Sequence, residues 1–119
     1  MLGRAFLAGG LTLALSSLVA CGGSAPKPAA EALTIDVTIA NGQVTPTNAK
    51  MNATVGEQIT LHVTSDVKDE LHVHSVPDHK FEVAASPNQQ FQFSVDVPGN
   101  VDVELHHLKR TVVTIQVNA

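Results

Sequence analysis

The sequence predicts an all-β domain, folded as an antiparallel Greek-key β-sandwich of about seven or eight strands. Apolar and polar residues alternate over several short runs, which is the period of a strand with one buried face. Turn-forming residues separate these runs, and no long stretch after residue 20 shows the 3.6-residue period of a helix. Short strands at this spacing are typical of two sheets packed around one core.

The expected strands follow this alternation along the chain. Their apolar positions are Leu33 to Ile39, Ile59 to Val63, Phe91 to Val97, Val101 to Leu105 and Val113 to Val117. Turns are expected at Asn41-Gly42, Gly56-Glu57, Ser65-Asp66, Ser86-Pro87-Asn88 and Pro98-Gly99-Asn100. Asparagine, glycine and proline adopt the backbone angles of tight turns, so these clusters set the limits of each strand.

The first twenty residues have the layout of an export signal. Arg4 supplies a positive charge, and the stretch behind it is apolar but too short for a stable membrane-spanning helix. Leu18-Val19-Ala20-Cys21-Gly22 resembles the lipobox of bacterial lipoproteins. The resemblance implies cleavage before Cys21 and attachment of palmitate-type acyl chains to this cysteine. Several buried acyl chains anchor a protein durably to a membrane.

These features divide the chain into three parts. We expect a signal peptide at 1–20, a lipidated Cys21 with a flexible linker at 21–32, and one domain at 33–119. The linker is made of small residues and proline, which have little apolar surface to bury. The domain is therefore expected in the cell envelope, tethered to a membrane and outside the cytoplasm, on the periplasmic or the cell-surface side. Whether the membrane is the inner or the outer one stays open.

Composition excludes several classes of partner. Once Arg4 leaves with the signal, six basic residues stand against eleven acidic ones, a formal net charge of −5. Such a charge argues against nucleic acid as a partner. The domain has no tryptophan or tyrosine and only three phenylalanines, so it offers few flat faces for stacking sugars or bases. Because Cys21 is the only cysteine, no internal disulfide forms and the core must hold by packing.

The histidines are the candidate functional groups, and all six lie between residues 62 and 107. His72 and His74 form a His-x-His motif, and residues two apart on a strand share one face at roughly 6.5 Å. Leu71 and Val73 would then be buried on the other face. Two imidazoles on one face can close on a single metal ion, and imidazole suits copper, zinc, nickel and iron.

The other histidines carry weaker signals. Neighbouring strand residues point to opposite faces, so only one of His106 and His107 is expected as a ligand. If the strand continued that far, His107 would face inward and His106 outward. His62 alternates with threonines and is explained by a solvated sheet face, whereas His79 is expected in a loop.

The segment from Ile35 to Val117 resembles a cupredoxin-like domain, in particular the small kind found in bacterial lipoproteins. The residues that carry the resemblance are Thr64-Ser65-Asp66, Asp69-Glu70-Leu71-His72-Val73-His74, Phe91-x-Phe93 and Pro98-Gly99-x-Val101-x-Val103-Glu104-Leu105-His106. Asp69-x-x-His72 is similar to the strand that provides the first histidine of copper sites in this fold. The resemblance implies a metal site at one end of the sandwich.

The chain departs from the blue-copper pattern at the ligands. The family's pattern would place a thiolate at Leu105 and a histidine at Leu108, and no methionine follows. Without the thiolate there is no His₂Cys centre, which argues against electron transfer of the plastocyanin type. The resemblance instead implies a nitrogen-rich site, with His72 and either His106 or His107. The residues near it in sequence are His74, Glu104, Asp69 and Glu70, and Met51 is a candidate soft ligand.

The leading hypothesis is a lipid-anchored domain that binds copper, or zinc as the alternative, for metal storage, delivery or protection. Imidazole ligands favour Cu(II) over Zn(II) by intrinsic affinity. The second hypothesis is a metal-free sandwich that serves as a structural or interaction module for an envelope protein. An enzyme is not expected, because Cys21 is lipidated and no serine lies in a recognisable nucleophile motif.

Overall fold

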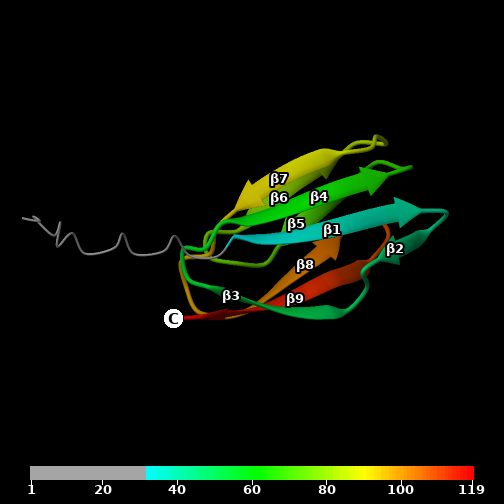
Figure 1. Ribbon diagram of the computed structural model, residues 1–119. Helices are drawn as coiled ribbons and strands as arrows, with labels where there is room; N and C mark the ends of the chain where they lie inside the picture. The colour runs from blue at the N-terminus through cyan, green and yellow to red at the C-terminus, as the bar shows by residue number, and fades with distance from the viewer. Residues whose placement is uncertain (1–31) are drawn as a thin grey trace, which may run out of the picture.

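The computed structural model describes residues 32–119, which form nine strands in a two-sheet sandwich (Figure 1). The strands are β1 (Leu33–Ala40), β2 (Gln43–Thr45), β3 (Ala49–Thr54), β4 (Ile59–Ser65), β5 (Asp69–Val73), β6 (His79–Val83), β7 (Gln89–Phe93), β8 (Gly99–Leu105) and β9 (Arg110–Asn118). The four-stranded sheet has the order β2-β1-β4-β7, and the five-stranded sheet has the order β3-β9-β8-β5-β6. The all-β sandwich prediction is confirmed.

The core lies between the sheets and follows the alternation of the sequence. The inward residues of β1, which are Ile35, Val37 and Ile39, are buried, and the polar residues between them are exposed. The same pattern holds in β4, β5, β8 and β9, so aliphatic side chains from both sheets fill the interior. Burial of this apolar surface is the main favourable contribution to the free energy of folding. The one cysteine of the protein, Cys21, lies before the domain, so no disulfide adds to it.

Not every pair of strands is antiparallel. Among residues 32–119, β1 pairs with β4 and β3 pairs with β9 in parallel, while the other pairs are antiparallel. The reason is the path of the chain: after the β1–β2 hairpin it crosses to the other sheet and returns as β4. Asn41 and Gly42 form this hairpin turn with φ of 53° and 73°, angles that asparagine and glycine tolerate best.

Three short strands were not marked by alternation. β2 has only three residues, and the inward positions of β3 are Ala49, Met51 and Ala53, which are weak strand formers. β6 begins at His79, where the sequence predicts a loop; that expectation is wrong, because the chain reverses within residues 74–78 and pairs His79 with Val73.

One side of the sandwich is closed by aromatic side chains from β6 and β7, which belong to different sheets. The ring of Phe81 lies 5.1 Å from that of Phe91 and 6.2 Å from that of Phe93, between centroids. His79 packs against the same cluster, with its ring 5.6 Å from that of Phe93, and its Nε2 is buried without a hydrogen-bond partner. Aromatic packing therefore joins the two sheets at this edge.

The sandwich has two ends that the later argument uses. At the proximal end, where β1 begins, lie the loops 55–58, 74–78 and 94–98 and the C-terminus (Figure 1). At the distal end lie the turns 41–42, 66–68, 84–88 and 106–109. The predicted signal peptide, Cys21 and nearly all of the linker lie outside the described residues. The described residues include no helix with the length and hydrophobicity that a membrane span requires.

Candidate metal-binding face

His72 on β5 and His74, which directly follows this strand, lie together on the outer face of the five-stranded sheet. Leu71 and Val73 are fully buried on the inner face, as expected, so the two histidines must point outward. Their ring centroids are 3.9 Å apart with an interplanar angle of 39°. The His72 side chain is 25% exposed and the His74 side chain is 45% exposed, so both rings are reachable from solvent.

Each of these rings has a carboxylate partner on a neighbouring segment. His72 Nε2 lies 3.0 Å from Oδ2 of Asp78, in the loop before β6. His74 Nε2 lies 3.1 Å from Oε2 of Glu104, on β8. Because a carboxylate only accepts hydrogen bonds, Nε2 of each neutral ring is the donor in these pairs. That tautomer leaves Nδ1 of each ring with a free lone pair.

His106 and His107 lie in the turn that follows β8 at the distal end. Their rings meet edge to face, with centroids 5.4 Å apart. An inward His107 was expected only if the strand continued through it, but β8 ends at Leu105 and both histidines are exposed. The backbone N–H of His106 donates to the carbonyl of Glu70, and that of His74 donates to Asp102. His74 therefore lies beside Asp102, and His106 is four residues farther along the same segment, roughly 13 Å away.

Asp69 has a structural role that the sequence pattern did not reveal. Its buried carboxylate accepts hydrogen bonds from the backbone N–H groups of Glu70, His107 and Leu108, at 2.7, 2.8 and 3.1 Å. It thus faces inward and ties the start of β5 to the turn that carries His106. In the sequence, Asp69 looks like an ordinary polar residue at the start of a strand. Nothing there indicates that its carboxylate binds the backbone of the turn after β8.

The positions of the blue-copper ligands are part of the apolar core. Leu105 is buried and Leu108 packs against the core. Met51 also packs on the core, from β3, and two strands separate β3 from β5 in the sheet order. Neighbouring strands are about 4.8 Å apart, so Met51 lies well away from the paired histidines.

This face offers nitrogen donors from the paired histidines and oxygen donors from the neighbouring carboxylates. Within residues 32–119 no three or more histidine, cysteine or acidic side chains converge on one point in a metal-binding geometry. What the structure does bring together is a pair of imidazoles, each with a carboxylate on its other ring nitrogen. Metal-ligating histidines usually donate their second ring N–H to a carboxylate in this way. The arrangement suits Cu(II) or Zn(II) and does not suit a thiolate copper centre.

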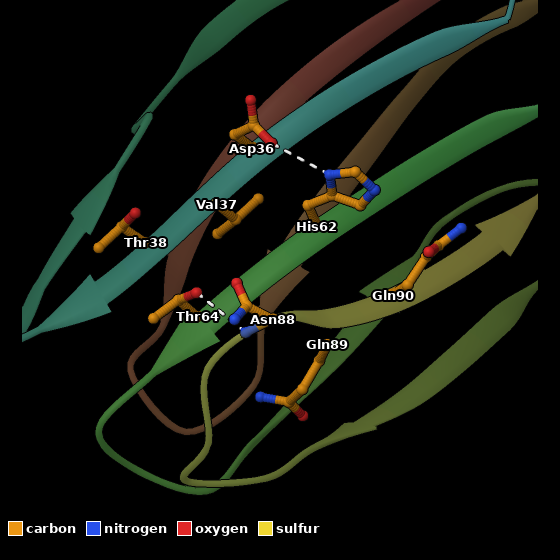
Figure 2. A pocket seen from close by; sticks show the side chains of 8 residues that line it. All are labelled: Asp36, Val37, Thr38, His62, Thr64, Asn88, Gln89 and Gln90. Carbon is orange, nitrogen blue, oxygen red and sulfur yellow. Dashed lines mark hydrogen bonds and ion pairs between the residues drawn. The ribbon is translucent and has the colours of Figure 1, made fainter.

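The outer face of the four-stranded sheet carries a second histidine–carboxylate pair (Figure 2). His62 Nδ1 lies 3.3 Å from Oδ1 of Asp36, on neighbouring strands in parallel register. They line a hollow of about 330 Å³ together with Val37, Thr38, Thr64, Asn88, Gln89 and Gln90. Both side chains are exposed, so His62 lies on a solvated face, as the sequence predicts.

Comparisons with known proteins give a likeness of fold only. No known protein family matches the sequence, and no curated protein matches it. Among solved structures, the chain is similar to a purple cupredoxin from Nitrosopumilus maritimus, with a TM-score of 0.52 and 13% identity over 72% of this chain and 99% of that one.

It is similar also to a chain of a heme-copper terminal oxidase, with a TM-score of 0.52 and 14% identity over 80% of this chain and 76% of that one. An amicyanin variant with Cu(I) matches at a TM-score of 0.48 and 16% identity, over 71% of this chain and 82% of that one. At such identities the likeness concerns the backbone and not the ligands. The described domain has a cupredoxin-like fold.

Proposed function

We propose that the protein is a lipid-anchored envelope protein that binds Cu(II), or Zn(II) as the alternative, through His72 and His74. The pairing of the two imidazoles at 3.9 Å, each with a carboxylate on Nε2, is the observation that carries the proposal. The role is metal storage, delivery or protection rather than electron transfer or enzymatic catalysis, because a solvent-reachable two-imidazole site lacks the thiolate of a blue-copper centre.

The tautomers define how the metal would be held. Asp78 and Glu104 accept from Nε2, so Nδ1 of each ring is the atom that would bind the metal. The carboxylates then keep each ring in a fixed orientation. His106 is diagonal to His72 across β5 and β8 but roughly 13 Å from His74 along the strand direction, so the proposed site uses the two paired imidazoles alone.

A calorimetric titration of residues 32–119 with Cu(II) and Zn(II) at pH 7.5 tests the proposal. This piece contains both sheets and the whole core, and it excludes the thiol of Cys21. We expect one metal per chain with a dissociation constant below about 1 μM, because two or more imidazoles act together. Affinity should fall below about pH 6, since protons compete for the neutral imidazoles. Binding that is unchanged at pH 5 contradicts a histidine site.

A metal-free structural or interaction module is the second candidate, and the same contacts favour it. Asp78 and Glu104 already satisfy Nε2 of both rings, so the face is stable as a set of cross-strand hydrogen bonds. If the titration shows that the domain binds several metals weakly and with similar affinity, this second candidate is supported. Cross-linking in intact cells would then be used to find an envelope protein held by the sandwich.

The membrane anchor is a separate proposal with its own test. It rests on the lipobox-like sequence that ends at Cys21. Cells that express the full chain and are fed radioactive palmitate should label it, and the Cys21→Ser variant should stay unlabelled and leave the membrane fraction. Labelling that persists in the variant would place the lipid elsewhere.

A further inference from the structure

We infer that the proximal end of the sandwich is a docking surface for a phospholipid bilayer, with Val76 and Val97 as its contact residues. The inference rests on the proposed lipid anchor at Cys21 and goes beyond it, because an anchor alone does not orient a domain. The proposed occupant is a membrane surface without net negative charge.

The two valines form one exposed apolar patch. Val76 is 60% exposed and Val97 is 47% exposed. Their loops are joined, since the backbone N–H of Asp96 donates to the carbonyl of Val76 at 3.0 Å. Both valines line a hollow of about 180 Å³ together with Pro98. In the described part of the chain, Val67 is the one other large hydrophobic residue with comparable exposure, at 41%, and it lies at the distal end.

The chain enters the domain at this same end. The backbone N–H of Leu33 donates to Gln58 in the loop 55–58, and that of Gly56 donates to Val95 in the loop 94–98. Ten residues lie between Cys21 and Ala32, and the eleven steps from one to the other reach at most roughly 40 Å. An anchor at Cys21 therefore joins the domain at its proximal end, and the turns of the distal end lie at the opposite end of the strands (Figure 1).

Tethering to the membrane allows a small apolar surface to bind the bilayer. Two partly exposed valines bind membrane too weakly to hold a free domain, since even one whole acyl chain gives marginal binding. A short linker raises the effective concentration of the surface to the millimolar range, where weak contacts are populated. Asp78 and Asp96 are exposed in the same loops, so anionic headgroups would repel this end.

The docked orientation would also position the candidate metal face. His74 lines the same hollow as the two valines. A metal held by His72 and His74 would therefore lie at the edge of the domain nearest the membrane, within reach of a membrane-embedded donor or acceptor of the ion. The turn with His106 and His107 would face away from the bilayer.

Spin labels on the full chain test the orientation. Cys21 is the only cysteine and is acylated in the anchored protein, so Val76→Cys, Val97→Cys and the control Val67→Cys each take one label. The anchored proteins would be placed in phosphatidylcholine vesicles, and flotation would first confirm the anchor. Label accessibility would then be measured by power saturation with oxygen, which enters lipid, and with chromium oxalate, which stays in water.

We expect the labels at Val76 and Val97 to show a ratio of oxygen to chromium oxalate accessibility at least threefold above that of the Val67 label. A further Val97→Asp change in the Val76→Cys protein should bring its ratio back to that of the control. Equal ratios at all three positions in floating vesicles would overturn docking and leave the anchor intact. Protection of the Val76 label from both reagents, only in native membranes, would assign the patch to a protein partner and overturn the lipid surface.

Failure of flotation would remove the anchor and, with it, the proposed docking. Metal titration is independent of all these outcomes, because it uses the soluble domain.

Discussion

The two outer faces of the sandwich carry the same chemical pair in different settings. On the four-stranded sheet, His62 contacts Asp36 and its side chain is 49% exposed. On the five-stranded sheet, His72 contacts Asp78, but its ring also packs against that of His74 and it is half as exposed. A histidine beside a carboxylate is thus an ordinary surface pair, and the contact with a second imidazole distinguishes the proposed metal site from it.

Strand pairing explains why the two faces differ. β1 and β4 are parallel and in register, so Asp36 lies directly opposite His62, with threonines on both sides. β5 and β8 are antiparallel, and Glu104 is opposite His72. Glu104 nevertheless contacts His74, along the diagonal. Diagonal neighbours lie about 7–8 Å apart, which long side chains can span. Each ring of the His-x-His motif therefore finds a separate carboxylate.

The largest effect is expected from Asp69→Ala, which removes the carboxylate that holds the turn behind the histidine-rich face. Three backbone N–H groups lose their acceptor, and we expect a loss of about 3 kcal/mol in the free energy of unfolding. Urea denaturation would measure it. Asp66→Ala is the matched control at the same end, since exposed Asp66 accepts one bond from Asn41 and should cost about 1 kcal/mol. Equal losses in both variants would contradict the role assigned to Asp69.

The next effect is on metal affinity and separates the two faces directly. Replacing His72 and His74 together by alanine should weaken Cu(II) binding roughly 100-fold or more, about 2.7 kcal/mol. His62→Ala should leave the affinity within about twofold, because one exposed histidine with a carboxylate is not a chelating pair. Calorimetry on residues 32–119 decides this, and a double variant that binds as tightly as the parent removes the proposed site.

A smaller effect is expected from Glu104→Gln, which keeps the size of the side chain and removes the charge beside His74. Loss of such a carboxylate partner typically costs metal affinity, and we expect a decrease of about tenfold. Glu82→Gln is the control, because Glu82 is exposed on the neighbouring strand β6 and should change little. A Glu104→Gln protein with parental affinity would show that the metal does not use the ring of His74.

The smallest effect is expected from Asp36→Asn on the four-stranded sheet. Asp36 is 84% exposed, and such pairs with a histidine add little to stability. We expect a change of less than about 0.5 kcal/mol in the free energy of unfolding. A loss above 1 kcal/mol, by thermal or urea unfolding, would mean that the two faces are more alike than their geometry indicates.

The alternation of apolar and polar residues predicted much of the fold, but it predicted less of the candidate site. Alternation placed Ile35, Leu61 and Val103 in the core because a strand has a two-residue repeat. It did not mark β3, whose inward residues are two alanines and a methionine, or the parallel pairing of β1 with β4, which depends on how the chain crosses between sheets. Register between distant strands is a tertiary property and leaves little trace in local sequence.

The same limit applies to the candidate site. The His72–His74 pair was predictable, because spacing along one strand determines it. The partnerships with Asp78 and Glu104, and the inward turn of Asp69, depend on contacts across strands and could not be read locally. His79 was misplaced for the same reason, since a sharp reversal at residues 74–78 returns it to the aromatic cluster.

The aromatic edge has a consequence for how the domain opens. β6 forms backbone hydrogen bonds only with β5 in the described sandwich, and β7 only with β4, so Phe81, Phe91 and Phe93 are the main link between them. Separating these rings breaks no ladder between strands. Amide hydrogen exchange in β6 and β7 should therefore occur by partial opening of this edge, whereas β8 and β9, at the centre of the five-stranded sheet, should exchange only when the whole domain unfolds.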